Sequence, residues 1–381
     1  MSWGGFRRGL QTVHLWAGLA LAVPFVLLGI SGSLLMLQPE LPRMSYPYAT
    51  GRGEVHSVAR IMEAAAAVVP GAQGLNRVSM PQRTGEPAIL RYGGQGTRRL
   101  VFVDPVNLEI LDAQPQLATG DLFTGIRTLH ATLYMSSYTE KDFVGWIGVA
   151  LTLLSLSGLV LWWPRGGQWK AAFGIKRGAT GHRLNRDLHS TAGFWTLGLY
   201  LVVCISGIYL AFPREFRNSV GSVFPLGYNY AFPEPSDVAP LPPEQWLQPD
   251  AVAELALGAV ENARLVLIDL PGGDNPVAVV TLVPANQGMG APPITISVDA
   301  ELAQVSYVDD PRDYLMGDRV VIWQRYLHSG LGLGFAWRAL VFVSGFLPLL
   351  FAITGIRMWW LKRAQRRLAV RATADAATPA Q

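Results

Sequence analysis

The chain has 381 residues, of which 50% are hydrophobic and only 15% are charged, and its mean hydropathy is +0.26. This composition is typical of a membrane protein. The single cysteine, Cys204, excludes an intramolecular disulfide and a C-x-x-C-H attachment site, so any haem is held without thioether bonds. The net charge of +4 comes without the basic face of a nucleic-acid-binding protein, and we expect no nucleic-acid partner.

Four apolar runs are each long enough for the ~20 residues that a bilayer-spanning helix needs. They lie at about 15–37, 143–163, 191–212 and 337–361. The first run follows Arg7 and Arg8, as a signal peptide would, but it is too long for one and no small-x-small cleavage site follows it. The sequence therefore predicts four transmembrane helices.

Lysine and arginine gather between the second and third runs and again after the fourth, and such charges set the orientation of a membrane protein. We expect a bacterial inner-membrane protein in the lipid bilayer with both termini cytoplasmic. The expected segments are the N-terminus and first helix (1–37), a periplasmic segment (38–142), the second helix (143–163), a basic cytoplasmic loop (164–190), the third helix (191–212), a second periplasmic segment (213–336), the fourth helix (337–361) and a cytoplasmic tail (362–381).

Each long periplasmic segment contains one apolar helical stretch followed by alternating strands. Asp104 and Asp299 mark the same strand, turn and returning strand in the two segments. The helical stretches lie at 58–69 and 251–260, and the strands at 88–111 and 265–308. The predicted fold is therefore an α-helical membrane protein with four transmembrane helices in two repeated pairs and two small α+β periplasmic domains.

Four histidines repeat in register. His14 and His189 each begin an H-x-x-A-G motif, 175 residues apart, and His130 and His328 each end an R-x-L-H motif, 198 residues apart. Such self-similarity at a fixed interval indicates an internal duplication. Each apolar run also carries an [IL]-[ST]-G element, which we interpret as a wall for a cofactor slot or as a helix-packing contact. These elements contain Ser31-Gly32, Ser157-Gly158, Ser206-Gly207 and Thr354-Gly355.

Ionisable side chains near membrane depth are rare and usually functional, so the paired histidines are candidate metal ligands. Haem iron accepts two axial imidazoles. Zinc usually takes three or four clustered ligands, and neither a Cys-rich group nor an H-E-x-x-H motif accompanies these pairs. We therefore expect each pair to hold one metal centre, with haem iron favoured over zinc. His14 and His189 would be its axial ligands on the cytoplasmic side, and His130 and His328 on the periplasmic side.

Arginines stand three residues before three of these histidines, at Arg127, Arg186 and Arg325. They are expected to pair with haem propionates or, alternatively, to anchor lipid headgroups. His182 precedes His189 by seven residues and would share its helix face. It is a reserve ligand or an electron-entry residue if that helix is continuous, and a solvated loop histidine otherwise.

With these motifs the chain resembles the PepSY-associated transmembrane proteins, which include iron-regulated inner-membrane reductases for ferric siderophores. The resemblance covers nearly the whole chain and rests on H-x-x-A-G, on R-D-L-H before the third helix, on the Asp104 and Asp299 turns and on the W-W helix ends. It implies two PepSY-like periplasmic domains and two b-type haems that move electrons to a periplasmic ferric siderophore. Ala300 replaces the family's proline, and Gln11 replaces an arginine before His14, which weakens a symmetric propionate arrangement.

The expected function is thus a haem-dependent ferric-siderophore reductase, with a hydroxamate siderophore as substrate and an electron donor in the cytoplasm or the membrane. Possible substrate contacts, which interfacial anchoring explains equally well, are Trp246, Tyr228, Tyr230 and Tyr46. One alternative is a non-enzymatic binding or regulatory protein whose histidines are structural. Another is an iron-chelate permease, which would need a polar pathway, whereas the apolar runs contain little that is polar beyond serine, threonine and Cys204.

Overall fold

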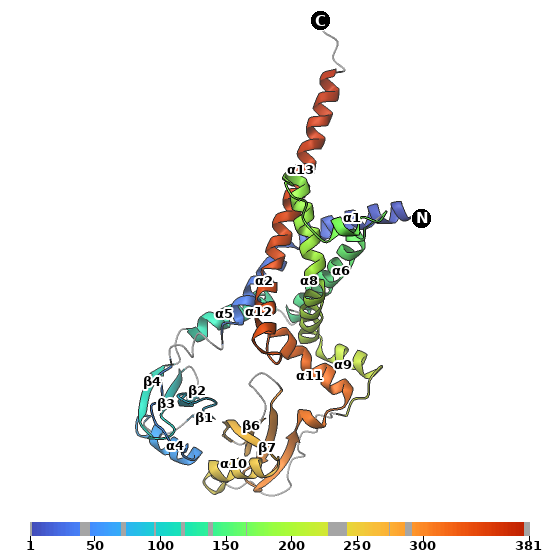
Figure 1. Ribbon diagram of the computed structural model, residues 1–381. Coiled ribbons are helices and arrows are strands. Elements are labelled where there is room, and N and C mark those ends of the chain that lie inside the picture. Colours follow the sequence, from blue (N-terminus) through green and yellow to red (C-terminus); the bar gives the residue numbers. More distant parts are fainter. Residues whose placement is uncertain are drawn as a thin grey trace. The chain divides into compact units, whose positions relative to one another are not determined.

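The computed structural model describes residues 2–38, 46–69, 74–94, 97–115, 119–135, 140–164, 166–227, 242–273, 275–285 and 292–376. The chain divides into two compact units (Figure 1). A helical unit comprises residues 1–37, 124–219 and 323–381, and a sheet unit comprises residues 38–123 and 220–322. Tyr228 and Tyr230, two of the expected substrate contacts, lie outside the described residues.

The helical unit has the membrane-spanning character that the composition predicts. Its helices are α1 (Trp3–Ala20), α2 (Ala22–Leu35), α6 (Glu140–Trp162), α7 (Trp169–Ala172), α8 (Gly181–Ala211), α12 (Gly334–Ser344) and α13 (Leu347–Ala376). Helices α5 (Thr119–Thr132), α9 (Pro213–Gly221) and α11 (Met316–His328) contribute residues to both units. Among the described residues, three stretches are long and apolar enough to cross a membrane, and a fourth is present if the bent pair α1 and α2 forms one span. The protein is therefore a membrane protein with three to four candidate spans.

The first span differs from the straight run expected at 15–37, because α1 and α2 meet at Leu21 with a bend of 60°. Proline explains the break. Pro24 has no N–H to donate to the carbonyl of Ala20, where α1 ends, and its ring would clash with that carbonyl. Pro348 stands in the same relation to Ser344, where α12 ends.

The basic connection expected at 164–190 is partly helical, because α8 begins at Gly181. Its first turns are stabilised by an Arg183–Asp187 ion pair at helical i,i+4 spacing and by Asn185, whose amide donates to the carbonyl of Gly181. His189 consequently lies inside a 31-residue helix and not at the end of a loop.

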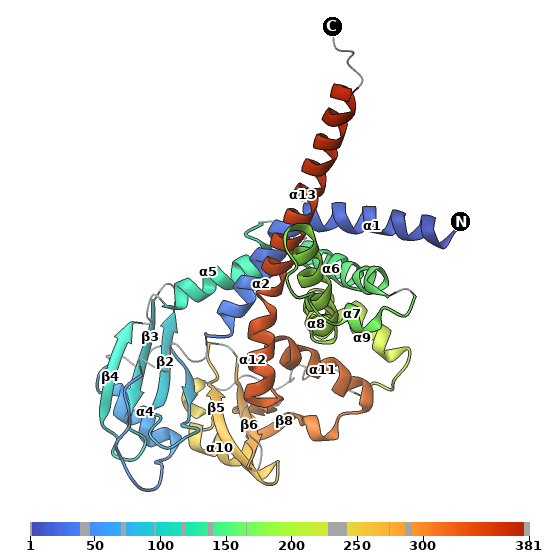
Figure 2. The same cartoon turned by 45° about the horizontal axis from the view of Figure 1, so that its top comes forward.

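Small residues let the helices of this unit approach closely. A Cβ on Gly29 of α2 would lie 2.3 Å from the carbonyl oxygen of Gly345, next to α12, and the Ser33 hydroxyl donates to the carbonyl of Phe342 at 2.6 Å. Gly145 of α6 similarly leaves room for Phe212, which follows α8. Backbone-to-backbone packing of this kind is common between membrane helices. It brings α6 beside α8 and α2 beside α12 and α13 (Figure 2).

The sheet unit contains one antiparallel sheet of eight strands in the order β4-β3-β2-β1-β5-β6-β7-β8. The first segment supplies α4 (Val58–Ala66), β1 (Leu75–Ser79), β2 (Ala88–Gly94), β3 (Thr97–Val103) and β4 (Ile110–Pro115). The second supplies α10 (Pro249–Gly258), β5 (Ala263–Asp269), β6 (Val277–Pro284), β7 (Ile294–Asp299) and β8 (Gln304–Asp309). Short 3-10 turns lie at Pro243–Gln245 and Pro311–Asp313.

The two segments therefore share one sheet instead of forming the two separate domains that the sequence predicts. Strands β1 and β5 pair with each other, with Arg77 opposite Asp269. Each would otherwise be an unpaired edge whose backbone groups need partners. The Arg77 guanidinium also donates to the Asp269 carboxylate at 2.7 Å across this junction.

The core of the sheet unit lies between the sheet and the helices α4 and α10. Alternate residues of the strands face it, as the pattern of β6 shows, where every second side chain is buried. Ile61 of α4 and Leu90, Ile268 and Leu282 of the sheet are fully buried there. The period-two alternation read from the sequence thus corresponds to one buried face of the sheet.

Asp104, at the turn from β3 to β4, is fully buried. Its carboxylate accepts hydrogen bonds from the backbone N–H groups of Thr50, Gly51, Val106 and Asn107 at 2.8–3.1 Å. Burial opposes the charge, but these four donors outweigh it and hold the pKa of Asp104 below its usual value. Asp104 thereby joins the turn to the segment that precedes α4.

Candidate metal centres in the helical unit

The four repeated histidines form two facing pairs. His14 of α1 and His189 of α8 have ring centroids 6.3 Å apart, and His130 of α5 and His328 of α11 have centroids 6.0 Å apart. These are the partners that the repeat spacing indicates. In the part of the chain that the structure describes, no three His, Cys, Asp or Glu side chains cluster as a metal site. Each pair does bring two imidazole rings close enough together for both to bind one metal ion.

Every imidazole is held by an [IL]-[ST]-G element of another helix. In the first pair, His14 Nδ1 lies 2.7 Å from the Ser157 hydroxyl of α6, and His189 Nδ1 lies 2.8 Å from the Thr354 hydroxyl of α13. The glycines that follow these hydroxyls lie beside the rings, but a Cβ at Gly158 would be 3.6 Å from His14 Cε1, an ordinary contact distance, so the first pair does not require glycine there.

The second pair is held more tightly. Nδ1 of His130 lies 3.1 Å from the Ser31 hydroxyl and 2.9 Å from the carbonyl oxygen of Leu28. Nδ1 of His328 lies 3.2 Å from the Ser206 hydroxyl and 3.0 Å from the carbonyl oxygen of Val203. Each ring of this pair thus has two oxygen partners. In the first pair His189 also has a backbone hydrogen bond, to Phe351, whereas the oxygen partner found for His14 is the Ser157 hydroxyl.

The sequence did not assign this role to the [IL]-[ST]-G elements, which we expected to line a cofactor or to pack helices. The contacts are long-range, for example 143 residues between His14 and Ser157, so local pattern could not reveal them. One feature of the sequence does point to this role. The number of [IL]-[ST]-G elements equals the number of repeated histidines, with one element in each apolar run.

The two pairs lie at different levels of the helical unit. His189 and Ser206, which contacts His328, both belong to the continuous helix α8 and are 17 residues apart. At 1.5 Å per residue this separation is about 25 Å along the helix axis. The hydrocarbon core of a bilayer is about 30 Å thick, so the pairs are spaced as two sites near opposite faces would be.

A cavity of about 1300 Å³ opens on the first pair. Its apolar walls include Leu154, Leu197 and Phe351. His182 lines the same cavity from the first turn of α8 and is half-buried, so it is not part of a loop. The basic residues of the lining are Arg7, Arg183, Arg186, Lys362, Arg363 and Arg366. The cavity therefore combines an apolar interior with positive charge.

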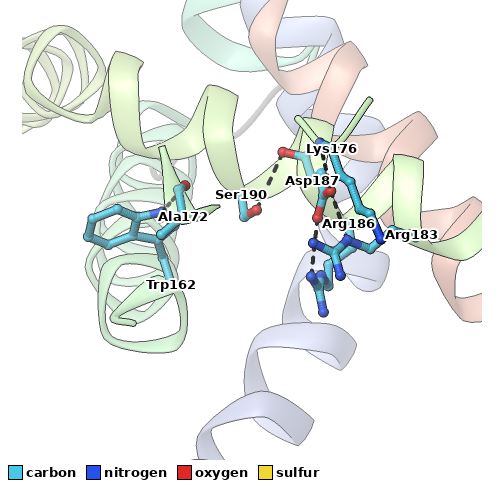
Figure 3. A network of polar contacts seen from close by, with 7 residues as sticks. All are labelled: Trp162, Ala172, Lys176, Arg183, Arg186, Asp187 and Ser190. Atoms are coloured by element: carbon cyan, nitrogen blue, oxygen red, sulfur yellow. Dashed lines mark hydrogen bonds and ion pairs between the residues drawn. The ribbon is translucent and has the colours of Figure 1, made fainter. Parts of the chain in front are cut away.

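Asp187 neutralises part of this charge (Figure 3). Its buried carboxylate accepts hydrogen bonds from Arg183 Nε at 2.8 Å, from Arg186 Nη2 at 3.2 Å and from the backbone N–H of Lys176 at 3.3 Å. In the same view, Trp162 Nε1 donates to the carbonyl of Ala172 at 3.0 Å. These contacts fix the connection between α6 and α8 at the cavity.

The three arginines singled out from the sequence are exposed. Arg186 pairs with Asp187 while about half of its side chain, 53%, stays accessible. Arg127 and Arg325 are exposed one helical turn before His130 and His328, on α5 and α11. Of the other expected contacts, Tyr46 packs against Phe102 with the two rings tilted by 50°, and Trp246 packs against the core of the sheet unit, so both have structural roles there.

The family with the description PepSY-associated TM region matches residues 11–362. The chain belongs to this family. No relative among curated proteins matches the chain. The PepSY-associated TM match contains both histidine pairs and all four [IL]-[ST]-G elements, whereas Arg7, Arg363 and Arg366 of the cavity lie outside it.

Proposed function

We propose that this PepSY-associated transmembrane protein is a reductase of the bacterial inner membrane that holds two b-type haems and delivers electrons to a ferric siderophore on the periplasmic side. One observation carries the proposal. The helical unit contains two pairs of imidazoles at two levels. Within each pair the two rings face each other, with centroids 6.3 Å apart in the first pair and 6.0 Å apart in the second.

The ring centroids, 6.3 and 6.0 Å apart, leave space for one metal ion between the two imidazoles of each pair, so His14 with His189 and His130 with His328 would each be able to hold one haem iron. The cavity beside His14 and His189 has the apolar walls that a porphyrin requires, and its arginines suit the carboxylates of haem propionates. The residues present are therefore those that a bis-histidine haem needs.

The chain's own residues would bind the haems, line the first haem site and pair with the haem propionates. His14 with His189, and His130 with His328, would hold one haem each, and a bound haem supplies a centre that accepts and donates one electron at a time. Leu154 and the other apolar side chains of the cavity would pack against a haem at the first site. Gln11 lines this cavity but carries no charge. The positively charged residues of the cavity are Arg7, Arg183 and Arg186 beside Asp187, and Lys362, Arg363 and Arg366.

The direction of transfer is part of the proposal. Lysine and arginine in the short connections favour a cytoplasmic position for both termini, and in that orientation the first pair would lie on the cytoplasmic side and the second on the periplasmic side. One electron converts iron(III) to iron(II), and the lower charge weakens every iron–oxygen attraction in a hydroxamate chelate at once. The resemblance to ferric-siderophore reductases, the ferrioxamine reductase among them, supports this substrate class. The donor is a cytoplasmic or membrane reductant.

The test is the absorption spectrum of the full chain in detergent, oxidised and after dithionite, with pyridine haemochrome stoichiometry on the same sample. We expect two b haems per chain and one after His14→Ala, His189→Ala, His130→Ala or His328→Ala, with added imidazole restoring the second. His56→Ala is the matched control, because this exposed histidine lies in the sheet unit. A folded, colourless protein expressed with ample haem would refute the proposal and favour a non-enzymatic binding role.

A further inference from the structure

The four hydroxyls that meet the histidines share a second contact. Ser157 donates to the carbonyl of Leu154 at 2.7 Å, and Thr354 donates to that of Leu350, also at 2.7 Å. The same contact recurs in the other pair, where Ser31 and Ser206 donate to the carbonyls of Leu27 and Val202, each at 2.6 Å. Each hydroxyl has only one proton, and the backbone of its own helix accepts it.

This proton count fixes the tautomer of each histidine. A hydroxyl whose proton is engaged can only accept, so the contact of 2.7 Å between Ser157 and His14 requires a proton on Nδ1 of His14. The carbonyl of Leu28 is an acceptor by nature, so Nδ1 of His130 is protonated for a second reason. In a neutral imidazole with Nδ1–H, the Nε2 nitrogen has a free lone pair, which is the form that binds a metal.

The glycine of each [IL]-[ST]-G element lies next to the histidine ring. The two pairs differ in how closely the ring approaches this glycine. A Cβ would lie 2.8 Å from the ring of His130 at Gly32 and 3.0 Å from that of His328 at Gly207. In the first pair, the corresponding distance is 3.9 Å at Gly355. The rings of the second pair are thus confined by contact as well as by two hydrogen-bond acceptors.

We propose that Ser31, Ser157, Ser206 and Thr354 are positioning residues that hold Nδ1–H of the facing histidine, so that each pair presents two Nε2 lone pairs to one iron. This inference rests on the proposed function. The histidines depend on their hydroxyls unequally. A backbone carbonyl backs up the hydroxyl at His130, His328 and His189, whereas at His14 the Ser157 hydroxyl is the oxygen partner described above.

An acceptor on Nδ1–H makes the imidazole a stronger electron donor at Nε2 and fixes its orientation, and loss of such a partner typically weakens metal binding by about 10-fold to 100-fold. A more electron-rich ligand stabilises oxidised iron. Removal of the acceptor should therefore raise the midpoint potential of the affected haem. The rise should be larger for Ser157→Ala, which leaves Nδ1–H of His14 without its hydroxyl, than for Ser206→Ala, which leaves the carbonyl of Val203 in place for His328.

The experiment compares the full-length wild type, Ser157→Ala and Ser206→Ala by potentiometric titration, by electron paramagnetic resonance of the oxidised haems and by haem retention. Ser155→Ala is the matched control, because Ser155 lies on the same helix and cavity wall but donates only to the carbonyl of Leu151. Ser157→Thr keeps a hydroxyl and should restore the wild-type potential even if the alanine variant folds poorly.

We expect one haem of Ser157→Ala to have a raised potential and about 10-fold to 100-fold weaker retention, with a smaller shift of the same sign in Ser206→Ala. Equal behaviour of Ser157→Ala and Ser155→Ala, or a larger shift in Ser206→Ala, would overturn this inference and leave the proposed function standing. A wild-type chain without haem would overturn both.

Discussion

Substitution of Asp104 by asparagine tests what holds the sheet unit together. One carboxylate oxygen accepts the N–H groups of Thr50 and Gly51, and the other accepts those of Val106 and Asn107. An amide keeps one oxygen and replaces the other with a donor, so two buried N–H groups lose their acceptor whichever way the amide turns.

The loss can be worked out from these contacts. Hydrogen bonds to a charged acceptor contribute about 1.5–3 kcal/mol each, so two amount to about 3–6 kcal/mol. The neutral amide no longer carries a buried charge, which offsets part of this, and we expect about 3 kcal/mol. Hydrogen exchange of the full chain in detergent should then be about 100-fold faster at the pair of amides that faces the new NH2 group, either Thr50 and Gly51 or Val106 and Asn107, because every 1.4 kcal/mol is a factor of ten.

Asp299, at the equivalent turn between β7 and β8, provides the control. A single carboxylate oxygen of Asp299 accepts both of its contacts, from the N–H groups of Glu301 and Leu302. Asparagine keeps such an oxygen, so Asp299→Asn should change exchange at its turn little. If Asp104→Asn also left exchange unchanged at all four amides, those of Thr50, Gly51, Val106 and Asn107, the four contacts of Asp104 would not stabilise the unit as argued.

Three further predictions concern the helices and the sheet junction. Gly29→Ala places a methyl group against the facing backbone carbonyl and should lower the thermal midpoint in detergent by several degrees, whereas Gly198→Ala, which has open space, should not. Arg77→Ala removes the partly exposed ion pair between β1 and β5 and should lower the free energy of unfolding in urea by about 0.5–1 kcal/mol. A loss of more than about 2 kcal/mol, which is typical of the truncation of a core side chain, would contradict this. His182→Ala should keep two haems, and loss of one would make His182 a ligand.

Acidification provides a further prediction for the same buried carboxylate. Because four N–H groups hold the pKa of Asp104 below its unfolded value, the stability that it contributes is fully present above that unfolded value, about 3.9. It is lost as the pH falls through the lower, folded value. The difference in thermal midpoint between wild type and Asp104→Asn should therefore shrink between pH 5 and pH 2.5. A constant difference over this range would contradict the assignment.

The histidine pairs could be predicted from the sequence because the repeated motifs indicate which residues, far apart in the chain, lie close together in the fold. His14 and His189 stand in the same motif, as do His130 and His328, and equivalent positions of a duplicated chain can meet across the axis between the halves. The apolar runs and the alternating strands were also visible, since they depend on local composition and on period-two burial.

Features that depend on distant partners were not visible. Strand β1 has the sequence LNRVS, which is short and largely polar, and it becomes a strand because β2 and β5 pair with both of its edges. The start of α8 was misplaced because the polar residues from Gly181 onward look like a loop until Asp187 is paired with Arg183. The role of Ser157 was missed because its partner, His14, belongs to another helix.

Both halves of the chain meet through like positions. His14 faces His189 and His130 faces His328 in the helical unit, and β1 pairs antiparallel with β5 in the sheet unit. A twofold-symmetric homodimer of half-length chains would make the same self-complementary contacts. In a single polypeptide, by contrast, the residues on the two sides of each contact can differ. Ser157 beside His14 and Thr354 beside His189 are a difference that a symmetric dimer could not encode.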